Sequence, residues 1–275
     1  MTQIAPPLDS APRPRERRQR VQAAETGMAV LKALARLGGR ASLTALATEV
    51  NEQPSKVHRY LVSMIEAGIV VQDSGSGHYR LGLEALYIGL AAMRQADPIR
   101  VAEPALVRLR EQLGVTCFIA VMGNKGPTIV RFEEPGLPVT VNVRVGSVMS
   151  LLWSATGRVF LGLQDDAQVR RLALEELDGA DAASRAALDA RDPLGALQRE
   201  VRAAGCSIVI DTNLKGISAV SAPIFNHAGQ VCGALTALGT TGGFDAAAQG
   251  PIAVALRAEA QAASRELGYP PARAA

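Results

Sequence analysis

The polar residues that follow Pro54 carry the clearest potential for chemistry in this sequence. In the segment PSKVHRYL, Val57 and Leu61 have the spacing of inward positions on a helix. That helix would present five polar side chains outward: Ser55, Lys56, His58, Arg59 and Tyr60. A lysine pairs with a phosphate as a point charge, and a guanidinium donates two hydrogen bonds to a guanine edge or a phosphate. These residue types on one face favour contact with DNA; the alternative is the polar side of an ordinary surface helix.

Groups suited to catalysis or metal binding are few and scattered. The three cysteines, Cys117, Cys206 and Cys232, stand in apolar runs and lack the short spacings of a metal site. Cys117 and His227 could pair as nucleophile and base, but no pattern supplies an orienting group. The sequence contains no phosphate-binding loop. We therefore expect no enzyme activity, metal or cofactor, and a cytoplasmic protein with reduced cysteines and no membrane contact.

Three helices and a hairpin are predicted to position the polar segment. Apolar residues at helical spacing run up to Gly38-Gly39, and Ser42 is placed to cap a short second helix. Pro54 suits the first turn of a third helix, and two short extended runs then flank the loop 73–77. Residues 22–82 therefore predict a winged helix-turn-helix. In such a motif the second helix, here the one that begins at Pro54, enters the major groove of DNA. Four further residues of this region are candidate DNA contacts: Ser42, Thr44, His78 and Arg80.

The positive charge is concentrated at the front of the chain. Residues 1–82 carry 11 Lys and Arg against 7 Asp and Glu, whereas residues 83–275 carry 18 against 19. Residues 1–21 combine prolines and arginines with little apolar content, which predicts a disordered basic arm. The arm either contacts DNA or is a solvated tail.

The remaining sequence predicts a linker helix within residues 83–98 and a larger second domain over residues 99–270. This domain opens with a helix over 99–113 and ends with one over 249–267. Strands are expected at 116–122, 128–133, 139–145, 206–210, 217–225 and 231–238, with helices at 152–163, 166–176 and 184–204. The order of strands, helices and strands indicates an α+β domain, an antiparallel sheet with flanking helices.

A small-molecule site is expected where a strand gives way to the helix near Ser154. Helix N-termini offer unpaired N–H groups and the positive end of the helix dipole, which suit a carboxylate. Trp153 could lie against a ring, and hydroxyls in the strands could point into the same cavity. The candidate ligand contacts are Leu152, Trp153, Ser154, Ala155, Asp211, Ser221 and Thr236. The alternatives stay open: helix caps, core packing, hydroxyls bonded to the backbone, and a polar turn.

Five passages resemble the isocitrate-lyase-regulator (IclR) family of transcription factors. They are Ser55–Leu61, His78–Gly82, Arg144–Ser147, Ser154–Arg158 and Ala219–Asn226, in the family's order. The chain departs from the family at three positions. Val209 and Thr212 stand where the family has an acidic residue or serine and then a glutamate, and Ala219 replaces a frequent cysteine.

The resemblance implies a homodimer or a dimer of dimers that binds a palindromic operator in double-stranded DNA. It also implies a small effector, often an organic acid or an aromatic compound, in a GAF-like C-terminal domain. Two alternatives remain: a metabolite-binding protein or enzyme whose N-terminal domain serves only dimerisation, and a constitutive repressor whose pocket is filled. The outward polar residues after Pro54 argue against the first, because a pure dimerisation helix has no need of them.

Overall fold

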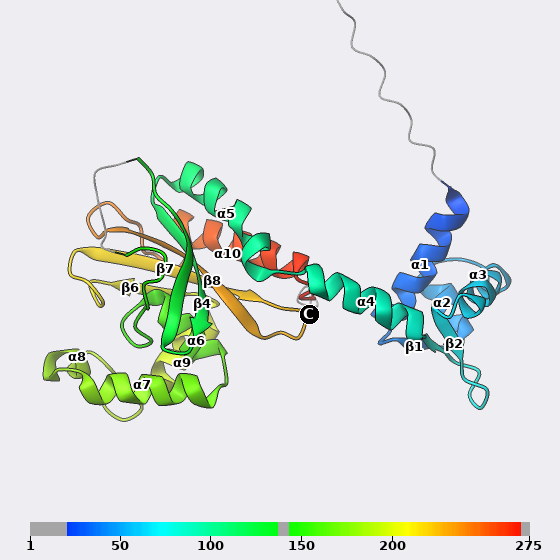
Figure 1. Cartoon of the computed structure of the whole chain (residues 1–275), viewed down its shortest axis with the longest axis horizontal. Helices are drawn as coiled ribbons and strands as arrows, with labels where there is room; N and C mark the ends of the chain where they lie inside the picture. The colour runs from blue at the N-terminus through cyan, green and yellow to red at the C-terminus, as the bar shows by residue number, and fades with distance from the viewer. Residues whose placement is uncertain (1–20, 137–142, 271–275) are drawn as a thin grey trace, which may run out of the picture. The chain divides into compact units, whose positions relative to one another are not determined.

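The computed structural model describes residues 21–136 and 143–270 (Figure 1). The chain divides into two compact units, residues 1–94 and 95–275. Nearly all of the basic arm expected at 1–21 lies outside the described residues, as does most of the strand expected at 139–145. In the described end of that strand, residues 143–147 form a loop with a turn at Val145-Gly146.

The first unit holds four helices and a small sheet. Its elements are α1 (Gln22–Arg36), β1 (Arg40–Ala41), α2 (Leu43–Glu49), α3 (Pro54–Glu66), β2 (Val70–Gln72), β3 (Tyr79–Leu81) and α4 (Leu83–Gln95). The three strands pair antiparallel in the order β1-β3-β2. Leu34, Leu46, Val57 and Leu61 are fully buried between the first three helices. The predicted helix-turn-helix with its hairpin is therefore present, and the two-residue β1 is an addition too short for any periodicity to reveal.

The second unit is built on one five-stranded antiparallel sheet. Its strands are β4 (Thr116–Gly123), β5 (Gly126–Glu133), β6 (Ser207–Ile210), β7 (Ile217–Phe225) and β8 (Val231–Thr240). They lie in the order β5-β4-β8-β7-β6, so the β4–β5 hairpin joins the three later strands where β4 pairs with β8. This is the α+β arrangement that the sequence predicts.

Helices cover both faces of this sheet (Figure 1). Helices α5 (Pro98–Leu113) and α10 (Pro251–Glu266) pack on one face, against the apolar side chains of Val220, Ala222 and Ile224. Helix α6 (Ala155–Leu163) lies on the other, with α7 (Ala167–Gly179) and α9 (Pro193–Ala204) packed against it. Each face therefore has its own hydrophobic core.

The prediction of a single helix over residues 184–204 is wrong. The structure has a short helix α8 (Ala182–Ala186), a loop, and then α9. The Asp189 carboxylate accepts hydrogen bonds from the backbone N–H groups of Arg191 (2.9 Å) and Asp192 (2.8 Å), which forms a turn. Asp192 then caps α9 through the N–H of Gly195 (3.0 Å), and Pro193 occupies the first turn. A residue before proline avoids helical backbone angles, so the chain must break there.

Candidate nucleic-acid interface and ligand cavity

Helix α3 presents its polar residues as the spacing predicts. Val57 and Leu61 are fully buried, which fixes the rotation of the helix about its axis. Ser55, His58 and Arg59 are exposed, and Lys56 and Tyr60 are half-buried. The helix starts directly at Pro54, with no side-chain cap on its first N–H groups. Its positive end is therefore open to an anion.

The five outward residues of α3 differ in whether their side chains already contact other parts of the protein. Lys56 Nζ forms an ion pair with Glu52 Oε1 (2.6 Å), and His58 Nδ1 lies 3.2 Å from the buried Tyr79 hydroxyl. The Tyr60 ring lies beside α1, because a Cβ built on Gly27 would be 3.5 Å from Tyr60 Cδ1. Within residues 21–136 and 143–270, the side chains of Ser55 and Arg59 form no hydrogen bond. These two are the most available to an incoming phosphate or base edge.

The two candidate residues at the start of α2 have different surroundings. Ser42 Oγ accepts a hydrogen bond from the Ala45 N–H (3.2 Å) and so caps the helix, as predicted. Its hydroxyl proton is still able to donate. Thr44 is exposed on the first turn. Both are placed at a helix N-terminus, where a phosphate is favoured.

The loop of the hairpin is held by one aspartate. Asp73 Oδ1 accepts hydrogen bonds from the Ser76 N–H (2.8 Å), the Ser76 hydroxyl (3.0 Å) and the Gly75 N–H (3.1 Å). The bond from the Ser76 N–H is the largest of the causes that lower the pKa of Asp73 below its ordinary value. Ser76 Oγ also accepts from Arg40 Nη2 (3.1 Å), so the loop orients a guanidinium.

Two arginines stand opposite each other on the sheet of the first unit. In the β1–β3 pairing, Arg40 is the direct partner of Arg80, and both are exposed. Like charges directly opposite each other destabilise a strand pair. Two exposed cations side by side are suited to an anion. Arg80 and His78 were predicted as DNA contacts and Arg40 was not, because no pattern reveals a strand of two residues. His78 is half-buried, and its Nδ1 lies 3.2 Å from the Ser76 carbonyl oxygen.

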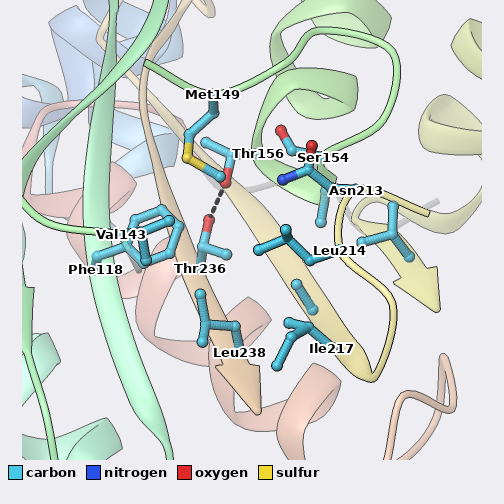
Figure 2. A pocket seen from close by; sticks show the side chains of 13 residues that line it. Phe118, Val143, Met149, Ser154, Thr156, Asn213, Leu214, Ile217, Thr236 and Leu238 are labelled. Carbon is cyan, nitrogen blue, oxygen red and sulfur yellow. Dashed lines mark hydrogen bonds between the residues drawn. The ribbon is translucent and has the colours of Figure 1, made fainter. Parts of the chain in front are cut away.

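A small cavity lies between the sheet and the start of α6. Figure 2 shows its apolar side chains around the hydrogen bond between Thr156 Oγ1 and Thr236 Oγ1 (2.8 Å). Thr236 Oγ1 also donates to Ser221 Oγ (2.9 Å), so three buried hydroxyls form a chain. The cavity has a volume of about 30 Å³. It is lined by Phe118, Val143, Met149, Ser154, Ala155, Thr156, Val209, Asn213, Leu214, Ile217, Ala219, Thr236 and Leu238.

Three of the seven predicted ligand residues line this cavity: Ser154, Ala155 and Thr236. Ser221 stands behind Thr236 in the hydroxyl chain. The other three do not line it. The Leu152 carbonyl accepts from Arg158 Nε (2.8 Å), and the Trp153 carbonyl accepts from Thr212 Oγ1 (2.8 Å).

The third of these, Asp211, closes a neighbouring loop. Its carboxylate accepts hydrogen bonds from the Thr241 hydroxyl (2.7 Å) and the Gly216 N–H (2.8 Å). Its backbone has a φ of 57°, in the left-handed region that a non-glycine residue seldom adopts. Asp211 therefore shapes the loop that carries Asn213 and Leu214 to the cavity.

The start of α6 offers the cavity two unpaired donors. Ser154 Oγ caps the helix by accepting from the Gly157 N–H (2.9 Å). Within the described part of the chain, the N–H groups of Ala155 and Thr156 have no hydrogen-bond partner. Phe118 and Leu238 were not predicted, because alternation along a strand does not say which face meets a cavity. Thr156 stands in the first turn of α6, next to the predicted Ser154 and Ala155.

Burial makes Cys117 and Cys232 poor nucleophiles. It raises the pKa of Cys117 to about 12 and that of Cys232 to about 11. Among the residues that the structure describes, no cluster of His, Cys, Asp or Glu could hold a metal ion. In the same ranges, every helix is too short or too polar to cross a membrane.

The folds of the two units and the surface of α3 define a regulator with a helix-turn-helix and a separate C-terminal domain. The IclR helix-turn-helix domain matches residues 23–74, and the bacterial transcriptional regulator IclR C-terminal domain matches residues 90–265. The protein belongs to the IclR family. It is a DNA-binding transcriptional regulator with an effector-binding domain, not an enzyme.

Individual relatives agree with this assignment. The crystal structure of HmgR from Pseudomonas aeruginosa is similar with a TM-score of 0.82 and 42% identity, over 90% of this chain and 99% of that one. The transcriptional repressor AllR from Klebsiella pneumoniae is 28% identical, over 79% of each chain. The Pca regulon regulatory protein from Pseudomonas putida is 26% identical, over 76% of this chain and 71% of its own.

Proposed function

We propose that this protein is a ligand-responsive regulator that binds a palindromic operator as a dimer, with α3 in the major groove. The observation that carries the proposal is the surface of α3, where Ser55 and Arg59 are exposed and lack partners in the described chain. Arg40 and Arg80 on the neighbouring sheet supply two more cations for the DNA backbone. In this arrangement Arg59 contacts a base edge or a phosphate. Arg40 and Arg80 contact phosphates and so fix the position of the domain along the duplex.

Helix α4 supports self-association. None of its residues is buried, although it carries six large apolar side chains. These exposed residues are Leu83, Leu86, Tyr87, Ile88, Leu90 and Met93. An exposed apolar stretch of this size is costly in water and is typical of an interaction surface. A second copy of the same helix provides a matching surface, and a two-fold dimer explains a palindromic operator. A regulator that binds DNA acts where the DNA is, so we place the protein in the cytoplasm.

The effector, on this proposal, is a small organic acid with an aromatic or similarly apolar body. The walls of the cavity near α6 supply Phe118, Met149 and Leu238 for the apolar part. The unpaired N–H groups of Ala155 and Thr156 and the positive end of the helix suit a carboxylate. A volume of about 30 Å³ holds little more than one water. Binding must therefore widen the cavity, and the loop of Asn213 and Leu214 is the part of its wall that lies on the surface.

The test of the DNA interface compares two Arg→Ala variants. A duplex selected from a random library serves as the operator, and affinity is measured by fluorescence anisotropy at fixed salt. We expect Arg59→Ala to lose about tenfold or more, the cost of one bidentate contact. Arg36→Ala is the matched control, because Arg36 lies on α1 and pairs with Glu49 at the surface (3.2 Å). Equal affinity of the Arg59 variant and the wild type would refute the assignment of α3.

The effector proposal has a separate test. The purified protein is screened by thermal unfolding against a panel of hydroxylated aromatic acids and aliphatic carboxylic acids. A ligand that binds the folded state raises the melting temperature. A hit should also change the anisotropy of the operator complex. A panel without any shift would instead support a constitutive repressor.

A further inference from the structure

A second, larger cavity lies at the edge of the sheet beside α10. It has a volume of about 420 Å³, within the usual range of about 300–1,000 Å³ for small-molecule sites. Strand β6 pairs with β7 only as far as Ser207 and Ser221, so residues 222–225 of β7 run past its end. The cavity occupies the space between this overhang and α10. It shares no lining residue with the cavity near α6.

The wall formed by α10 carries positive charge only. Arg257, Gln261 and Arg265 are spaced four residues apart, so they form one stripe along the helix, and all three line the cavity. The acidic residues of α10 are directed elsewhere. Glu259 forms a bidentate ion pair with Arg108 of α5 (2.6 and 3.0 Å), and Glu266 also acts electrostatically on Arg108. Among the residues that the structure describes, no carboxylate side chain lines the cavity.

Both guanidinium groups have donors left for a ligand. Arg257 contacts only neutral acceptors, Gln249 Oε1 (3.3 Å) and Cys206 Sγ (3.4 Å). Arg265 is exposed, and its side chain forms no hydrogen bond or ion pair within the described residues. Eight residues of helix separate their Cα atoms by about 12 Å along the axis. The two cations are thus placed for two anionic groups on one elongated molecule.

The other walls are apolar, and they do not suit a peptide strand. Ala222, Pro223 and Ala260 leave room for an aliphatic or planar body. The stacked rings of Phe225 and Tyr269 (centroids 4.8 Å apart) also line the cavity. Pro223 has no N–H, and the Phe225 N–H already donates to Ser264 Oγ (2.9 Å). An added β-strand would lack these donors, so this edge favours a small molecule.

We propose that the cavity between α10 and the overhang of β7 binds an elongated organic dianion of the dicarboxylate class, at a site separate from the effector cavity. Its two carboxylates pair with Arg257 and Arg265, and Gln261 lies between them. Its apolar chain lies along Ala222, Pro223 and Ala260. The site requires neither operator binding nor the aromatic effector, so it stands independently of the proposed function.

The test measures binding of defined probes to the full-length protein by isothermal titration calorimetry at low ionic strength. The dicarboxylate is suberate, and octanoate is the matched monoanion of equal chain length. We expect suberate to bind at least about tenfold more tightly than octanoate. Arg257→Gln and Arg265→Gln should each weaken suberate about tenfold, since each removes charge-assisted hydrogen bonds. Arg170→Gln on α7 is the control, because it removes the same charge from an exposed residue of the same unit outside the cavity.

Three results would overturn the proposal. The first is equal binding of suberate and octanoate, and the second is an equal effect of the Arg265 and Arg170 variants. The third is a change of oligomeric state in the Arg265 variant, measured by sedimentation velocity, without a change in suberate affinity. That last result would assign the cavity to a second copy of the chain. The Arg265 side chain is exposed and unpaired in the described chain, so we expect its variant to fold and to keep the test valid if the Arg257 variant misfolds.

Discussion

The proposed DNA surface of the first unit and the proposed effector cavity of the second unit differ in how far their polar groups are already paired. Arg59 is exposed and unpaired in the described chain, and Arg40 and Arg80 face each other as like charges. In the cavity the hydroxyls of Thr156, Thr236 and Ser221 already satisfy one another. The first surface therefore presents exposed cations with which an anion can pair. The second is stable without a ligand and must be opened by it.

The largest loss of stability is expected from Gly157→Ala. This variant tests whether the turn before α6 is rigid, as a cavity that is stable without a ligand requires. A Cβ at Gly157 would lie 1.9 Å from the Ser150 carbonyl oxygen and 2.5 Å from Leu151 Cα, both backbone atoms. The clash should destabilise the second unit by about 3 kcal/mol or more. Thermal unfolding followed by near-UV circular dichroism of Trp153, the only tryptophan, reports on this unit.

Gly179→Ala is the control, because nothing lies within 4 Å of a Cβ at that position in α7. It should leave stability unchanged or slightly higher. If the Gly157 and Gly179 variants had the same melting temperature, the turn before α6 would have adjusted to the added Cβ, and the cavity would be less rigid than proposed.

The second prediction tests the two opposed cations of the first unit. Arg40→Gln combined with Arg80→Gln should lower DNA affinity and reduce the slope of log affinity against log salt by about 2, if each arginine meets one phosphate. The same double variant should lose little thermal stability, because both side chains are exposed and the bond from Arg40 to Ser76 Oγ lies at the surface. Anisotropy titrations at several salt concentrations give the slope. An unchanged slope would place these arginines away from the DNA.

The third prediction concerns the hydroxyl chain. Thr236→Val keeps the shape of the side chain but leaves Thr156 and Ser221 without their shared partner. We expect a loss of about 1–3 kcal/mol in stability and a loss of the thermal shift by any effector found in the screen. Thr116→Val is the matched control, because Thr116 is buried on β4 and does not line the cavity. An effector that binds both variants equally would exclude Thr236 from its site.

The smallest effect concerns the hairpin loop and pH. Because the pKa of Asp73 is lowered in the folded state, its contribution to loop stability is fully present above the ordinary value of 3.8. It is lost as the pH falls below that value through the lowered pKa. The amide resonances of Gly75 and Ser76 should therefore stay constant from pH 7 to about pH 5 and shift only in more acidic solution. Asp73→Asn should remove this acid-induced change; a shift near neutral pH would contradict it.

Much of the first unit was predictable, because its determinants are local. The inward spacing of Val57 and Leu61 fixes the exposed face of α3, and Ser42 caps α2 through a bond three residues away. In the second unit, the break before α9 also has a local signal, the pair Asp192-Pro193. The Ala- and Leu-rich pattern around this pair nevertheless favoured one long helix. Local signals of this kind need no knowledge of the rest of the fold.

The sequence alone determined the two-unit organisation, the helix placed to meet DNA and the family resemblance, since these depend on periodicity, caps and short motifs. Only the tertiary structure decided which side chains share a cavity. Phe118, Thr156 and Leu238 come from three elements that are far apart in the chain, and Arg40 meets Arg80 only through strand pairing. The same holds for the arginines of α10. Their cavity exists because β6 does not extend alongside residues 222–225 of β7. Such neighbourhoods arise from sheet order and register, which no stretch of sequence contains by itself.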